Sequence, residues 1–156
     1  MKRTTLGLVF VMACGDGAHD TSAHHPDDHD EGCESAEDLD TFVQGLSKTG
    51  EGGTVVAIQA ADPAPPDVGE NAWTLEITGA TGAPLGEGAA VVVRPFMPEH
   101  GHGSTPPEFE ATRGEGPMWE VPTMDLFMPG VWEVTVAVSA GDSVSDQVVF
   151  RFCLEG

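Results

Sequence analysis

The sequence predicts an all-β fold, an immunoglobulin-like antiparallel β-sandwich of about seven strands. The chain has 156 residues, which is room for one ordinary domain and a tail. Its 20 Gly and 12 Pro indicate many turns and few long helices. From about Asp40 onward, short runs of β-branched and aromatic residues are separated by clusters of Gly and Pro. We therefore place the sandwich in residues 40–156.

Each expected strand is identified by its own apolar run. The clearest is 132–138, where every second residue is apolar, as in a strand with one buried face. The run 89–93 is apolar on both faces and is expected at the centre of a sheet. In the last run the alternation points Phe152 inward and Cys153 outward. The three tryptophans are expected in the core. Strands are expected at 54–60, 73–78, 89–93, 109–112 (a weak edge strand), 119–121, 132–138 and 148–152.

The start of the domain is ambiguous. Four apolar residues there have helical spacing, but Gly45 and the Gly-rich stretch 50–53 fit a strand leading into a hairpin equally well. We expect a strand. The apolar residues are Leu39, Phe42, Val43 and Leu46.

The first 13 residues are expected to be a lipoprotein signal peptide. A short positive region at 1–3 precedes an apolar run at 6–13, which is far shorter than a membrane-spanning helix. The stretch 11–15 resembles a bacterial lipobox, so Cys14 is expected to carry the lipid and to become the first mature residue. In the alternative, an ordinary signal peptide is cleaved nearby and Cys14 has no role. The lipoprotein interpretation places the protein in the bacterial cell envelope, attached to a membrane through the lipid and facing the periplasm or the cell surface.

If Cys14 is lipidated, two cysteines remain, Cys33 and Cys153, at the two ends of the predicted domain. In an oxidising compartment an even number of remaining cysteines, here two, predicts one disulfide. The alternative is two free thiols, which could serve as metal ligands.

Residues 14–39 are expected to form a disordered, acidic tether. They contain hardly any apolar side chain larger than Ala, so burial cannot offset the entropy lost on ordering. The tether also carries His19, His24, His25 and His29 among many carboxylates. A solvated spacer is the preferred interpretation, and weak capture of transition metals is the alternative.

The charge balance excludes one class of partner. The chain has 26 acidic and 6 basic side chains and a net charge of −20, a surface that repels phosphate backbones. We therefore expect no nucleic-acid binding. The sequence contains no Gly-x-Ser-x-Gly, no phosphate-binding Walker loop and no His-Glu-x-x-His, and we expect that the protein is not an enzyme.

The candidate site follows the central strand. Met97, His100 and His102 bring a thioether and two imidazoles together, and Met124 and Met128 could add further thioethers. Thioether and imidazole ligands favour copper as Cu(I), so copper is the expected cofactor if one is bound. The competing interpretation is structural, with Met-Pro turns closing one end of the sandwich and a Gly-His-Gly loop that needs unusual backbone angles.

Four segments resemble the YtkA-like domain family, which is related to the periplasmic part of FixH-type proteins. They are 71–73, 86–93, 97–103 and 128–134. The resemblance implies an extracytoplasmic β-sandwich, often anchored to a membrane, and some relatives are associated with copper handling or oxidase assembly. Two hypotheses follow. In one, a lipid-anchored protein binds copper for sequestration or delivery. In the other, a structural or interaction module of the envelope contacts a protein partner without metal.

Overall fold

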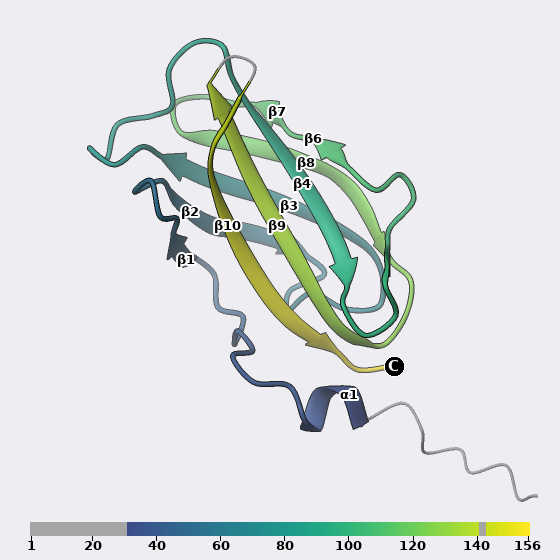
Figure 1. Cartoon of the computed structure of the whole chain (residues 1–156). Helices are drawn as coiled ribbons and strands as arrows, with labels where there is room; N and C mark the ends of the chain where they lie inside the picture. Colours follow the sequence, from purple (N-terminus) through teal and green to yellow (C-terminus); the bar gives the residue numbers. More distant parts are fainter. Residues whose placement is uncertain (1–30, 141–142) are drawn as a thin grey trace, which may run out of the picture.

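A computed structural model describes residues 31–140 and 143–156 as two antiparallel sheets packed face to face (Figure 1). The first sheet has the strand order β1-β2-β3-β8-β7 and the second β10-β9-β4-β5, with β6 also paired to β4. The fold is an immunoglobulin-like sandwich, as predicted, and seven of its strands have four or more residues. The elements are α1 (Glu31–Glu34), β1 (Leu46–Thr49), β2 (Val55–Asp62), β3 (Gly69–Thr78), β4 (Ala89–Met97), β5 (His102–Gly103), β6 (Phe109–Glu110), β7 (Thr112–Arg113), β8 (Met118–Leu126), β9 (Gly130–Ala140) and β10 (Ser143–Leu154).

Alternating side chains from both sheets form the core between them. Trp73, Trp119 and Trp132 are all buried, which confirms the expectation for the tryptophans. Trp73 on β3 meets Phe152 on β10 edge to face, with ring centroids 5.8 Å apart. Since β3 and β10 belong to different sheets, this contact joins the two layers.

The start of the domain differs from the prediction. The first strand begins only at Leu46, and the preceding residues run without strand structure beside β10 (Figure 1). Phe42 packs edge to face against Phe152, whereas Val43 is exposed. Gly45 separates the two regions, because its positive φ of 81° turns the chain into β1.

The weak edge strand expected at 109–112 is divided into two short strands in the structure. Phe109–Glu110 pairs with β4 in one sheet, and Thr112–Arg113 pairs with β8 in the other. Ala111 lies between them and donates its backbone N–H to Val91 of β4, at 2.9 Å. This short segment therefore crosses from one sheet to the other.

A buried carboxylate fastens the β1–β2 hairpin to β10. Asp146 is only 8% exposed, at a bulge in β10, and it accepts hydrogen bonds from the backbone N–H groups of Thr54 and Gln147, each at 2.9 Å. Burial by itself raises the pKa of Asp146. Hydrogen bonds from Thr54, Gly52 and Gln147 outweigh burial, so the pKa lies below its usual value of 3.8. A side chain at Gly50 would collide with this carboxylate.

All four basic side chains in the described residues already have partners. Three form ion pairs, and Arg113 lies over the Trp119 ring, 4.4 Å from its centroid. Arg151 Nε lies within ion-pair distance of the Glu133 carboxylate, but the geometry does not make a hydrogen bond. The ion pairs are Lys48–Asp40 at 2.7 Å, Arg94–Glu108 at 2.7 Å and Arg151–Glu133 at 3.1 Å.

Candidate functional site

The candidate site is the hairpin made by the end of β4 and the short strand β5. Met97 and His102 lie directly opposite each other, and Phe96 opposite Gly103. The turn between them closes with a hydrogen bond of 2.9 Å from the backbone N–H of Gly101 to the carbonyl of Met97. Gly101 has a positive φ of 67°, the backbone conformation that favours glycine. The Gly between the two histidines is therefore explained by the turn.

The hairpin brings the two imidazoles together. The ring centroids of His100 and His102 are 5.6 Å apart, with an angle of 36° between the planes. His100 is exposed and His102 is half-buried. Nδ1 of His102 is enclosed and has no hydrogen-bond partner. The pair combines one solvent-facing ring with one ring held against the protein.

Phe127, in the β8–β9 connection, holds His102 in place. The two rings stack with centroids 5.4 Å apart and planes 17° apart. Phe127 also meets Trp132 edge to face at 5.8 Å, and Trp132 donates its indole N–H to the carbonyl of Met128 at 2.9 Å. The orientation of His102 is thus linked to the core through two aromatic rings. Phe127 is not among the residues that the sequence pattern indicated for the site. The available signal was a large apolar residue just beyond the end of a strand.

The thioethers lie elsewhere. Met97 is 1% exposed and Met124 is 0% exposed, and both belong to the hydrophobic core. A side chain at Gly130 would approach the methyl group of Met97 to 3.0 Å, so Met97 packs against this glycine. Met128 is partly buried at the edge of the core. Of the five residues expected to bind metal, the structure brings together the two histidines, leaves Met128 partly accessible and places the other two thioethers in the interior.

The chain that follows β5 is fixed to the neighbouring sheet. Ser104 is buried and donates its hydroxyl to the backbone carbonyl of Asp125 on β8, at 2.7 Å. At Gly103 a side chain would collide with the carbonyl oxygen of Pro95. The hairpin is therefore closely packed on one side and open at its turn.

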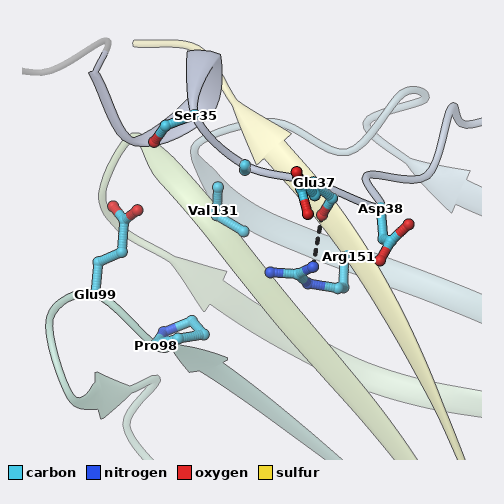
Figure 2. Close-up of a pocket in the computed structure, with 8 residues that line it drawn as sticks. Ser35, Glu37, Asp38, Pro98, Glu99, Val131 and Arg151 are labelled. Atoms are coloured by element: carbon cyan, nitrogen blue, oxygen red, sulfur yellow. Dashed lines mark hydrogen bonds between the residues drawn. The ribbon is translucent and has the colours of Figure 1, made fainter.

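A cleft of about 400 Å³ lies beside the hairpin turn. One wall belongs to residues 33–40, which we call the strap. Figure 2 shows Pro98 and Glu99 of the turn across the cleft from Ser35 and Glu37 of the strap. The cleft is lined by Ser35, Ala36, Glu37, Asp38, Pro98, Glu99, Val131 and Arg151.

Comparison with known proteins identifies the family. A model of the YtkA-like family matches residues 50–137, more than half of the chain. The chain belongs to the YtkA-like family. No curated protein and no solved structure matches it. The match covers the hairpin, including Met97, His100 and His102, but not the strap or β10.

Cys33 and Cys153 form a disulfide in this YtkA-like protein, with their Cα atoms 5.7 Å apart. Phe152 is buried and Cys153 lies on the opposite face, as the alternation predicted. Cys14 and the tether histidines lie outside the described residues. Within the described ranges, no helix is both long and apolar enough to cross a membrane. No three side chains of His, Cys, Asp or Glu come together as a metal site in that part of the chain.

Proposed function

We propose that this YtkA-like protein is a lipid-anchored, extracytoplasmic β-sandwich that binds a transition-metal ion, copper, for sequestration or delivery. The observation that carries the proposal is the 5.6 Å separation between the rings of His100 and His102. Two imidazoles that bind one ion at about 2.0–2.1 Å have centroids roughly 5–6 Å apart when the N–metal–N angle lies between tetrahedral and trigonal. The observed spacing supports one ion shared by the two rings.

The ligand types near the two imidazoles favour copper over zinc. Zinc sites take three or four nitrogen, sulfur or oxygen ligands, more than this pair supplies, whereas thioethers select Cu(I). Met128 is the thioether with partial exposure at this end of the sandwich. The Met97 side chain projects from the same face of the hairpin as His102, since the two residues are direct cross-strand partners. Met97 is buried in the core, so the hairpin would have to open before Met97 contacts an ion.

The cellular setting is argued from the cysteines. The Cys33–Cys153 disulfide favours an oxidising, extracytoplasmic compartment. The lipobox-like stretch ending near Cys14 supports attachment to a membrane through a lipid. In this proposal the tether histidines are weak auxiliary ligands that raise the local concentration of the metal ion.

The test is a Cu(I) titration against a chromophoric chelator. The protein carries Cys14→Ser to remove the lipid site, retains the disulfide, and has His19, His24, His25 and His29 replaced by Asn. His100 and His102 are then the only imidazoles left, because the chain has six histidines. We expect one Cu(I) ion per chain.

Adding His100→Ala and His102→Ala should weaken the binding at least tenfold, which is about 1.4 kcal/mol of binding free energy. Met128→Leu should have a smaller effect, and Met124→Leu none, because the Met124 side chain lies in the core. Equal affinity with and without the two histidines would exclude the hairpin as the metal site.

A second candidate function is supported by two exposed aromatic side chains. Phe96 is 43% exposed on β4, and Phe127 is 44% exposed. Large exposed aromatics are enriched at protein interfaces, which fits an interaction module of the envelope. The same titration separates the two candidates, because a pure interaction module binds no Cu(I) once the tether histidines are gone.

A further inference from the structure

β10 is the terminal strand of its sheet, with β9 on one side only. Such an edge exposes backbone N–H and C=O groups to which another strand can add. In Figure 1 the chain between α1 and β1 runs beside β10. The strap, residues 33–40, comprises the end of α1 and the start of this segment, and it lies at the C-terminal end of β10.

The strap occupies the hydrogen-bonding groups of that edge. The backbone N–H of Asp40 donates to the carbonyl of Arg151, and the N–H of Arg151 donates to the carboxylate of Asp40, each at 2.7 Å. Lys48 forms an ion pair with Asp40 and also donates to the carbonyl of Val149 at 2.9 Å. These are the positions that the backbone of an added strand would use.

A further contact of the strap comes from the side chain of Arg151. The guanidinium of Arg151 donates to the carbonyl of Glu37 at 2.6 Å (Figure 2). No residue of 33–40, all of which the structure describes, belongs to the hydrophobic core. The covalent link is the Cys33–Cys153 disulfide. Cys153 lines a hollow of about 780 Å³ together with Asp40 and the 63–68 loop, and this is the side from which a reductant would approach Cys153.

We propose that the Cys33–Cys153 disulfide is a redox-sensitive lock that keeps the strap on the β10 edge. A dithiol reductant of the envelope opens it. One thiolate of the dithiol attacks Cys153 Sγ, forms a mixed disulfide and releases Cys33 as a thiolate. The second thiolate of the dithiol then displaces Cys153. The reductant becomes a disulfide, and its two electrons leave both protein cysteines as thiols.

Opening the lock has two effects on the surface. The backbone N–H and carbonyl of Arg151, which the strap occupies, become free to pair with an incoming strand. The cleft beside Pro98 and Glu99 also loses its second wall. This inference is independent of copper binding, since neither effect involves an imidazole.

Amide hydrogen exchange in the full chain tests the lock, with the protein compared before and after treatment with a dithiol. The reporter is the Arg151 amide, which is bonded to the strap. The internal control is the Ile77 amide on β3, which belongs to the sheet that does not contain Arg151. This amide donates to the carbonyl of Pro117. We expect Arg151 to exchange about tenfold faster or more after reduction, with Ile77 unchanged. The Cys33→Ser/Cys153→Ser variant should reproduce the reduced protein without reductant.

Asp40→Asn with the disulfide intact is the matched variant. It weakens the carboxylate contact but leaves the strap attached, so its Arg151 amide should exchange more slowly than in the reduced protein. An Arg151 amide that stays protected after reduction would overturn the proposal. Equal acceleration at Arg151 and Ile77 would also overturn it, because the disulfide would then stabilise the whole sandwich and not the strap alone.

Discussion

Replacing Asp146 by Asn tests whether one carboxylate fastens the β1–β2 hairpin to β10. The carboxylate accepts from the N–H groups of Thr54 and Gln147 and is almost completely buried. A hydrogen bond to a charged group contributes about 1.5–3 kcal/mol, and a buried donor left without an acceptor costs about 1–3 kcal/mol. Asn keeps one acceptor oxygen but loses the charge and the second acceptor. We expect a loss of about 2–4 kcal/mol in the free energy of unfolding at pH 7.

This loss should depend on pH. The pKa of Asp146 is lowered in the folded protein, so its carboxylate contributes fully above the unfolded value of 3.8. The contribution is lost as the pH falls through the lower, folded value. The difference between the wild type and Asp146→Asn should therefore be constant from pH 7 to about 4 and shrink below that.

The measurement is urea unfolding of both proteins at a series of pH values, followed by tryptophan fluorescence. Asp125→Asn is the control, because the Asp125 side chain is exposed, and it should change the free energy of unfolding by less than about 0.5 kcal/mol. A difference between wild type and Asp146→Asn that stays the same at pH 7 and below pH 3 would refute the assignment of the stabilisation to the charged carboxylate.

Three glycine substitutions give further predictions. Gly50→Ala pushes a methyl group into the Asp146 carboxylate and should lower the unfolding free energy by about 1–3 kcal/mol, whereas Gly86→Ala, which meets nothing within 4 Å, should be nearly neutral in the same urea assay. Gly103→Ala forces the β4–β5 hairpin away from the Pro95 carbonyl and should weaken Cu(I) binding in the chelator titration. Unchanged affinity in Gly103→Ala would show that the hairpin geometry does not matter for the metal.

The long strands could be predicted from the sequence because one face of each is buried. The alternation in β3 and β9 fixes which residues enter the core, and the same rule placed Cys153 on the outer face, where the disulfide forms. The apolar run that predicts β4 ends at Val93, so the expected strand is shorter than the observed one. In the structure the strand continues to Met97, and the continued alternation carries Met97 into the core.

The remaining features depend on contacts distant in sequence. The crossing at Ala111 consists of two strands of two residues each, too short for any periodicity. The strap lies on β10 through Asp40 and Arg151, whose partnership spans 111 residues. The stacking of Phe127 on His102 joins the β8–β9 connection to the two-residue strand β5, and segments this short have no period from which a contact could be inferred. The candidate residues could thus be named from the sequence, but their grouping could not.

The contacts of the four described basic side chains determine the charge that the surface presents to solvent, ions and membranes. Lys48, Arg94 and Arg151 each form an ion pair with a carboxylate, so apart from Arg113 the unpaired charge on the described surface is carboxylate. A field of one sign attracts cations over distances near the Debye length, about 8 Å at physiological ionic strength, and repels anionic lipid headgroups. Metal ions and basic segments therefore reach this surface faster at low salt than at high salt. On an anionic membrane, the same field holds the sandwich away from the lipid surface.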